Sequence, residues 1–270
     1  MTTLRVATIN ILINQSRWHE RRDLLRRGLA AVDADVIALQ EVRDPAGGGN
    51  AHWLAAELGG YAVAACPKAG RGSRREGIAV LSRLPIAGHE VVDLGSQRRV
   101  AQFVRVAVAG RPVVVINGHY QFPVGAHRAQ TRQVGRVLER VRALGPGVRA
   151  VACGDFNATP RSPAIALMRT AFTSAHHARH GREPDYTCPT GLINGGRARR
   201  ALTRGLLRLA AVRPSDLWRG TLDYLFVDPA TRVVDCHLIL DRPHPDDPTL
   251  YASDHFGLAA TLDFGDGSAN

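Results

Sequence analysis

Six short polar segments join acidic, amide and imidazole side chains to apolar stretches that are typical of strands. They are Thr8-Ile9-Asn10, Leu39-Gln40-Glu41-Val42, Asn117-Gly118-His119, Gly154-Asp155-Phe156-Asn157, Leu222-Asp223-Tyr224 and Ser253-Asp254-His255. A carboxylate buried alone at a strand end costs several kcal/mol, so these acids need cations or hydrogen-bond donors. As a set, the side chains fit one site for a hard cation with oxygen ligands and imidazoles nearby.

The ligand types favour Mg²⁺ or Mn²⁺ over Zn²⁺, because the sequence has no Cys-x-x-Cys pair and the motifs hold no group of three histidines. Neither a Gly-rich loop ending in Gly-Lys-Ser/Thr nor a Gly-x-Ser-x-Gly motif is present, which argues against a P-loop nucleotide hydrolase and a serine hydrolase. Each segment alone has an ordinary explanation. Asn10 could close a turn, Asp254 could cap a helix and His119 could lie in the core, so the argument for chemistry depends on the whole set.

The elements that must position these segments follow from hydrophobic periodicity and from Gly and Pro punctuation. We expect strands over residues 4–9, 35–42, 77–82, 86–92, 101–108, 113–119, 149–155, 221–227, 232–240 and 256–262. We expect helices over residues 21–32, 51–58, 126–144 and 163–170. This order predicts an α/β protein with much antiparallel sheet, and two stacked sheets flanked by helices fit it.

The six segments, together with Glu-Gly-Ile-Ala-Val-Leu-Ser-Arg at residues 76–83, resemble the ordered motifs of the endonuclease/exonuclease/phosphatase superfamily. Its members include DNase I, apurinic endonucleases, sphingomyelinases, inositol polyphosphate 5-phosphatases and deadenylases. The resemblance covers about residues 3–262 and implies a four-layer α/β/β/α sandwich with two mostly antiparallel stacked sheets. We therefore expect one domain over residues 1–264, with a tail at residues 265–270.

The resemblance also implies the roles of the acidic and amide residues. Glu41 matches the main Mg²⁺ ligand, with Asn10 beside it, and Asp254 matches a second metal ligand or its partner. Asp155 matches the residue that orients or deprotonates the attacking water. Asn157 matches a contact to the phosphate or the metal.

The same resemblance gives the two histidines phosphate contacts. His119 matches a residue that hydrogen-bonds a phosphate oxygen, and His255 matches the histidine on the scissile phosphate, oriented by Asp223. The chain departs from the family pattern at Gly118, where Thr is usual, and at Gly257, where Pro is usual. Neither change removes a reacting group, so the sequence predicts an active metal-dependent phosphoric ester hydrolase.

Basic residues outnumber acidic ones by 35 to 24, giving a net charge of +11 that favours an anionic partner. Residues 176–220 hold nine arginines and three acids, and we expect a basic insertion there with a short helix over 198–211. Arg75, Glu76 and Arg99 are candidate substrate-binding residues, although Glu76 could equally form a salt bridge with a neighbouring arginine. Because 34 of the 35 basic residues are arginine, the charge could also reflect composition alone.

The sequence therefore predicts a Mg²⁺-dependent phosphoesterase that hydrolyses a phosphodiester or a phosphomonoester by direct attack of water, with nucleic acid slightly favoured as substrate. A phospholipid or inositol-phosphate hydrolase and a non-catalytic phosphate-binding protein stay open as alternatives. We expect no signal peptide, no transmembrane stretch and no obligate protein partner, and the scattered cysteines suit a reducing compartment. A cytoplasmic location is the expectation.

Overall fold

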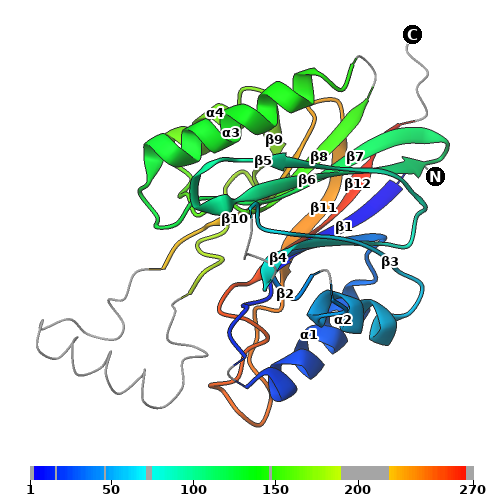
Figure 1. Ribbon diagram of the computed structural model, residues 1–270, viewed down its shortest axis with the longest axis vertical. Helices are drawn as coiled ribbons and strands as arrows, with labels where there is room; N and C mark the ends of the chain where they lie inside the picture. The colour runs from blue at the N-terminus through cyan, green and yellow to red at the C-terminus, as the bar shows by residue number, and fades with distance from the viewer. Residues whose placement is uncertain are drawn as a thin grey trace, which may run out of the picture.

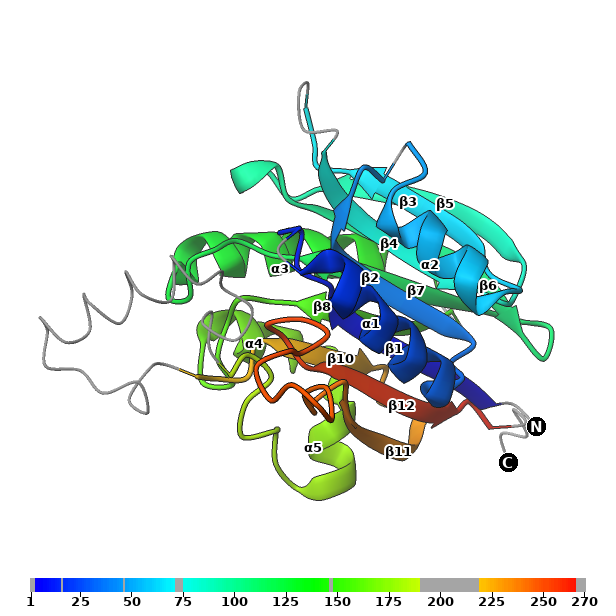
Figure 2. The same ribbon diagram turned by 90° about the horizontal axis from the view of Figure 1, so that it is seen from below.

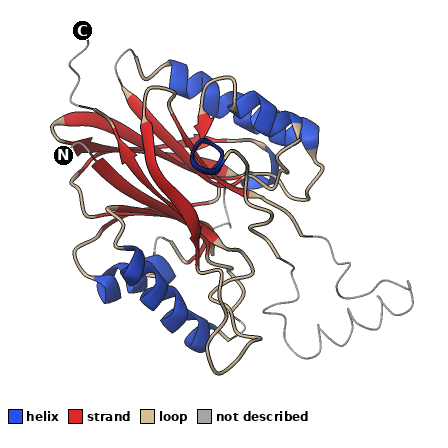
Figure 3. Ribbon diagram, turned by 180° about the vertical axis from the view of Figure 1, so that it is seen from behind, coloured by secondary structure: helices blue, strands red, loops and turns tan. Residues whose placement is uncertain are grey.

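Two six-stranded sheets lie face to face, and helices cover the outer side of each (Figure 3). The computed structural model describes residues 3–15, 17–45, 47–70, 75–145, 148–189 and 219–265. The first sheet has the order β11 (Arg232–Ile239), β12 (Gly257–Asp263), β1 (Thr3–Asn10), β2 (Val36–Arg43), β4 (Glu76–Ser82), β3 (Ala62–Pro67). The second has the order β5 (Ile86–Asp93), β6 (Val100–Val108), β7 (Arg111–His119), β8 (Arg149–Asp155), β10 (Asp223–Val227), β9 (Thr173–Ser174). Among these strands, only β1–β2 and β7–β8 pair in parallel.

The helices complete a four-layer sandwich (Figures 1 and 2). Residues of α1 (Trp18–Val32) and α2 (Asn50–Leu58) join the apolar cluster on the outer face of the first sheet. Residues of α3 (His127–Arg142) and α4 (Pro163–Met168) join the cluster on the outer face of the second. The short α5 (Ala175–His180) packs against β10 and β11, and the 3-10 turn η1 (Ser96–Arg98) precedes β6.

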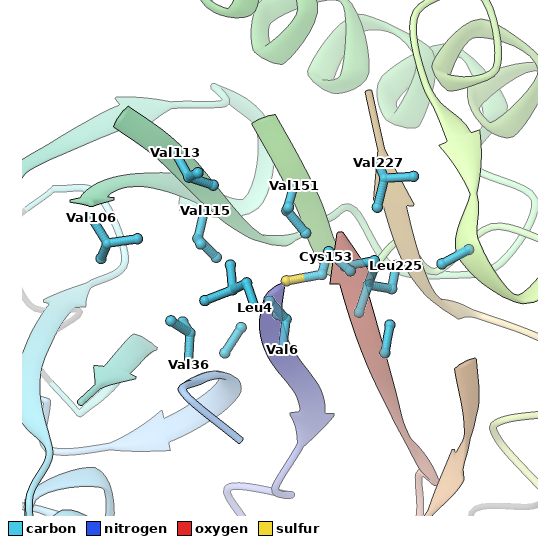
Figure 4. Packing of buried hydrophobic residues seen from close by; sticks show 14 of the residues in the cluster. Leu4, Val6, Val36, Val106, Val113, Val115, Val151, Cys153, Leu225 and Val227 are labelled. Carbon is cyan, nitrogen blue, oxygen red and sulfur yellow. The ribbon is translucent and has the colours of Figure 1, made fainter. Parts of the chain in front are cut away.

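Alternation along the strands sorts side chains between the layers, because successive residues point to opposite faces of a sheet. On β1, Leu4 and Val6 belong to the cluster between the sheets, whereas Ala7 and Ile9 pack towards α1 and α2. Figure 4 shows Leu4, Val6 and Val36 facing valines of β7 and β8. The central layer is therefore an apolar core shared by both sheets.

Buried amides join the two sheets where this apolar layer ends. Gln40 of β2 donates from Nε2 to Oδ1 of Asn117 on β7 at 2.8 Å. Asn117 Nδ2 donates in turn to the carbonyls of Leu39 and Ala79 at 3.0 Å each. Because an unpaired buried amide is costly, this pairing disfavours any slip of one sheet over the other.

The sandwich confirms the fold class expected from the sequence, and four elements were not foreseen: β3, β9, α5 and the turn η1. Within the basic insertion expected at 176–220, residues 176–189 and 219–220 are described, and there α5 packs on β11 and Cys188 pairs with Gly220. The helix expected at 198–211 and residues 266–270 of the expected tail lie outside the described residues. No helix in the described part of the chain is long and apolar enough to cross a membrane.

Candidate functional site

Strand alternation carries several polar side chains to one end of the inter-sheet layer. Asp155 follows Val151 and Cys153 at two-residue steps on β8, and both of those residues face the other sheet. Asn10 occupies the equivalent position at the end of β1, after Leu4 and Val6. The two side chains therefore meet, with Asn10 Nδ2 donating to Asp155 Oδ2 at 3.1 Å.

Glu41 reaches the same place by an irregularity in β2. In a regular strand it would point opposite to Gln40, towards the helices. The pairing of β2 with β4 shifts register between Leu39 and Val42, and Glu41 has a φ of 55°. This bulge aims the Glu41 carboxylate at the cleft, where it accepts from the Ile13 N–H at 2.9 Å and from Asn10 Nδ2 at 3.3 Å. A left-handed glutamate costs about 1–3 kcal/mol, as is often found at functional sites.

His255 and Asp223 form a buried pair. His255 Nδ1 lies 2.8 Å from Asp223 Oδ2, which also accepts the hydroxyl of Thr187 at 2.6 Å. Burial opposes protonation of His255, but the carboxylates of Asp223 and Asp155 outweigh it and raise the pKa of His255 well above its usual value. At neutral pH the imidazole is therefore protonated and held in one orientation by Asp223.

Asp155 is the carboxylate that the other groups share. Its Oδ1 accepts the backbone N–H of Asn157 at 2.9 Å, and its Oδ2 lies 3.9 Å from Nε2 of His255. Burial, together with the negative charge of Asp223, raises the pKa of Asp155 to about 7. Near neutral pH this carboxyl can therefore exchange a proton.

His119 is also buried but has cationic neighbours. Nη1 of Arg99 lies 2.7 and 2.9 Å from the two ring nitrogens, and a guanidinium can only donate. Burial and the charges of Arg99 and Lys68 lower the pKa of His119 well below its usual value. His119 Nε2 is 3.5 Å from Asp155 Oδ2, and because the ring is neutral this contact is not an ion pair.

Two sets of side chains in this region could hold a metal. One ligand atom each from Asp155, Asp223 and His255 lie within 4.8 Å of one another. The other set contains the oxygens of Glu41, Asn10 and Asp254, and the charge of Asp254, after burial, raises the pKa of Glu41. The second set suits a hard cation better, because Mg²⁺ prefers oxygen ligands and the first set includes an imidazole nitrogen.

One cleft, with a volume of about 490 Å³, gathers most of the residues expected from the sequence. Its lining residues are Glu41, Arg99, His119, Phe122, Pro123, Val124, Asp155, Asn157, Cys188, Leu222, Asp254 and His255. Asn157 lies here with its Nδ2 donating to the Tyr120 carbonyl at 3.2 Å.

Two of the candidate substrate-binding residues lie outside this lining. Glu76 contacts the cleft indirectly, through Arg99 at 3.6 Å, and it pairs with Lys68 at 2.5 Å. The side chain of Arg75 is exposed beside it. Arg71 and Arg74, part of the same basic stretch of the sequence, lie outside the described residues.

Arg21 is a positioning residue that sequence patterns did not reveal. It is fully buried, and its guanidinium donates to the carbonyls of Ile11 and Asn14, which follow Asn10, and to that of Ala252, which precedes the Ser253-Asp254-His255 segment. Arg21 thus links the two loops that carry Asn10 and His255. Its place in an arginine-rich helix hid it, because several neighbouring arginines have the same local pattern.

Comparisons with known proteins agree with this geometry. Residues 7–255 match the Endonuclease/Exonuclease/phosphatase family. The chain is 27% identical to Protein angel of Drosophila melanogaster over 169 residues, which cover 56% of this chain and 47% of that protein, so the match spans about half the length of angel.

Solved structures share the fold. The chain superposes with a TM-score of 0.77 on TDP2 of D. rerio complexed with single strand DNA product, at 17% identity, covering 97% of this chain and 100% of that one. It superposes with a TM-score of 0.74 on the human Nocturnin catalytic domain with bound sulfate anion, at 21% identity, covering 97% and 94%. At these identities the likeness shows the fold alone.

Proposed function

This chain belongs to the endonuclease/exonuclease/phosphatase family, and from that premise we propose that it is a Mg²⁺-dependent phosphoesterase that hydrolyses a phosphodiester by direct attack of water. It has the hydrolase fold of the family. The observation that carries the proposal is the buried His255–Asp223 pair beside Asp155 in a cleft that also holds Glu41 and Asp254.

Asp155 is proposed to orient the attacking water and to accept its proton. Its two oxygens are fixed by different donors, the Asn157 N–H and the Asn10 amide, which set the direction of the free lone pairs. A pKa of about 7 suits a general base at neutral pH, and such a base contributes about 10²–10⁴-fold to the rate.

The two histidines are proposed to bind the phosphoryl oxygens. Protonated His255 would donate to an oxygen that gains charge in the transition state, and Asp223 keeps it protonated and oriented. Neutral His119 would hydrogen-bond a second oxygen, and Arg99 would add a positive charge next to it. Asn157 is proposed to bind a phosphoryl oxygen as well. One N–H of its side-chain amide donates to the Tyr120 carbonyl, and the second N–H would donate to the phosphate.

Glu41, Asn10 and Asp254 are proposed to hold Mg²⁺, for which Mn²⁺ could substitute. The donor set fits because Glu41 and Asp254, two carboxylates that repel one another, line the same cleft, and a divalent cation would relieve that repulsion. Asn10 lies beside them, with its Nδ2 3.3 Å from Glu41 Oε1. When bound, the metal supplies positive charge that stabilises the phosphoryl oxygens.

Nucleic acid is the proposed substrate class. The net charge of +11 supports a polyanion, and one structural relative, TDP2 of D. rerio, is complexed with single strand DNA product. A lipid or inositol phosphate would use the same phosphate chemistry, so the two readings differ only in what flanks the phosphate.

The test is a panel of substrates assayed with Mg²⁺ and with EDTA: single- and double-stranded DNA, RNA, sphingomyelin, inositol phosphates and a chromogenic diester. We expect Mg²⁺-dependent hydrolysis of nucleic acid that EDTA abolishes and that Asp155→Asn and His255→Ala each reduce at least 100-fold. Unchanged turnover in both variants would overturn the assignment. Binding without hydrolysis, insensitive to EDTA, would favour a non-catalytic protein.

A further inference from the structure

Phe122 is an aromatic side chain exposed at the rim of the catalytic cleft. Phe122 is 57% exposed, and the other exposed large apolar residues of the described chain, Val91 at 43% and Val234 at 40%, are not among those that line the cleft. Single exposed apolar residues are ordinary on protein surfaces, so exposure by itself argues nothing. The position of Phe122 in the lining, next to Pro123 and Val124, sets it apart.

The backbone that carries Phe122 is held on both sides. The Gln97 side chain accepts from the Phe122 N–H at 3.1 Å and donates to its carbonyl at 2.6 Å, and Gln121 Nε2 donates to that carbonyl at 3.0 Å. The loop that presents the ring is therefore pinned to the turn before β6.

A second set of hydrogen bonds ties the same loop to the segment that follows β8. Buried Gln130 of α3 donates from Nε2 to the Pro123 carbonyl at 3.1 Å and to the Asn157 carbonyl at 2.7 Å. The backbone that bears the ring is thus held in a fixed relation to the segment that contains Asp155 and Asn157. A group that is already ordered loses little conformational entropy when a ligand packs on it.

We propose that Phe122 is a specificity-determining residue on which an unpaired nucleobase next to the scissile phosphate stacks. The substrate class is then single-stranded or locally unpaired nucleic acid, since a base inside a duplex is already stacked on its neighbours. This inference rests on the proposed phosphoesterase function and deepens it. Pro123 and Val124 complete a small apolar rim, while Arg99 and His119 provide the polar side of the cleft.

A lipid chain fits this rim less well. Binding at a membrane surface grows with the apolar area that enters the bilayer, and a single ring beside a proline and a valine offers little. The rim suits one planar base, and the positive charge of the chain suits the polyanion that carries it. Membrane binding is one of the results that the experiment can return.

The experiment compares two fluorescent single strands of one sequence, one with every base and one with abasic units around the cleavage site. The wild type should show a KM about 5- to 100-fold lower for the base-bearing strand, the range that stacking of one base provides. Phe122→Ala should bring the two KM values together, and Phe122→Trp should keep them apart. Val91→Ala is the matched control, an exposed apolar residue on β5 that should retain the wild-type difference.

Equilibrium binding of the same strands by fluorescence polarisation in EDTA gives a readout that needs no turnover. If no variant or wild type hydrolyses either strand, the proposed function fails, and the Phe122 inference still stands or falls on whether Phe122→Ala removes the binding difference. An unchanged KM and binding difference in Phe122→Ala would overturn it. The inference would also be overturned, in favour of a lipid surface, if Phe122→Ala lost binding to phosphatidylglycerol vesicles while its binding to nucleic acid stayed intact.

Discussion

Two halves of the cleft treat the same kind of side chain in opposite ways. In the Asp223 half (Asp223, His255 and Thr187), a buried histidine is protonated, whereas in the Arg99 half (Arg99, His119 and Lys68) a buried histidine is neutral. Both rings lie near one oxygen of Asp155, His119 at 3.5 Å and His255 at 3.9 Å. Their distance from the shared carboxylate therefore does not decide their charge.

The remaining neighbours decide it. Burial lowers the pKa of both rings, and for His255 two carboxylates reverse that effect, while for His119 the cations of Arg99 and Lys68 reinforce it. One cleft thus offers an imidazolium and a neutral imidazole at the same pH. A phosphate between them would meet the His255 imidazolium on one side and, on the other, the neutral His119 ring with the Arg99 guanidinium next to it.

Replacing each histidine by alanine should give the largest difference in activity between the two halves of the cleft. His255→Ala should lower kcat/KM by about 10²–10⁴-fold, since it removes a positive donor, and His119→Ala by only about 10-fold, since it removes a neutral hydrogen bond. His237→Ala, on the exposed face of β11, is the control and should be fully active. Equal losses at both histidines, with unchanged melting temperatures, would contradict the contrast.

Glu41→Gln should separate metal binding from the histidine contrast. We expect the Mg²⁺ concentration for half-maximal activity to rise about 10- to 100-fold, as for other losses of a metal-site partner. Saturating Mg²⁺ should restore part of the rate, and His119, whose pKa depends on Arg99 and Lys68, should keep the imidazole chemical shifts of the wild type. A variant with an unchanged Mg²⁺ dependence would show that Glu41 is not a ligand.

Much of this arrangement could be predicted from the sequence because it follows from local rules. The two-residue period of β1 and β8 brings Asn10 and Asp155 to the same end of the inter-sheet layer, and the alternation can be read from the residues. The direction of the Glu41 side chain could not be predicted from the sequence. It depends on a bulge in β2 whose register is fixed by β4, a strand distant in sequence.

The charges of the two histidines were also beyond the sequence. The family resemblance paired Asp223 with His255 but said nothing of the charge of the ring. Arg99 and His119 are 20 residues apart, and only the fold brings them together. Thr187 shows the same limit, since it lay within a segment expected to be an insertion but is buried against Asp223. Spacing predicts which strand ends carry polar groups, and tertiary contacts decide which of them are charged.

Asp223→Asn should make the Asp223 half of the cleft more like the Arg99 half, because it removes a negative charge beside His255. The wild-type kcat/KM should rise as pH increases through about 7, where Asp155 loses its proton, and fall again at higher pH as His255 deprotonates. Without the carboxylate the pKa of His255 drops, so the alkaline limb should move to lower pH and the maximal rate should fall about 10- to 100-fold.

The pH dependence of protein stability should also change in Asp223→Asn, in the direction set by the raised pKa of His255. A raised pKa in the folded state stabilises the protein below the unfolded histidine pKa, and that contribution is lost as pH rises through the folded value. Asp223→Asn should therefore lower the melting temperature more at pH 6 than at pH 9. An alkaline limb at the same pH in the variant and the wild type would assign that limb to another group.

Arg99→Leu should have the smallest effect on rate and the clearest effect on charge. Leucine keeps the site dry but removes the cation, so the pKa of His119 should rise towards its usual value while the pKa of His255 stays raised. Burial still lowers the pKa of His119 in the variant, so the shift should be partial.

Lys68→Met removes the weaker of the two cationic influences and should move the pKa of His119 in the same direction by less. Titration of both rings by NMR measures this directly, and KM should rise only about 2- to 10-fold in Arg99→Leu, the range for loss of a hydrogen bond. If the pKa of His119 stayed low in both variants, burial alone would set its charge, and the two halves of the cleft would differ only in the carboxylates around His255.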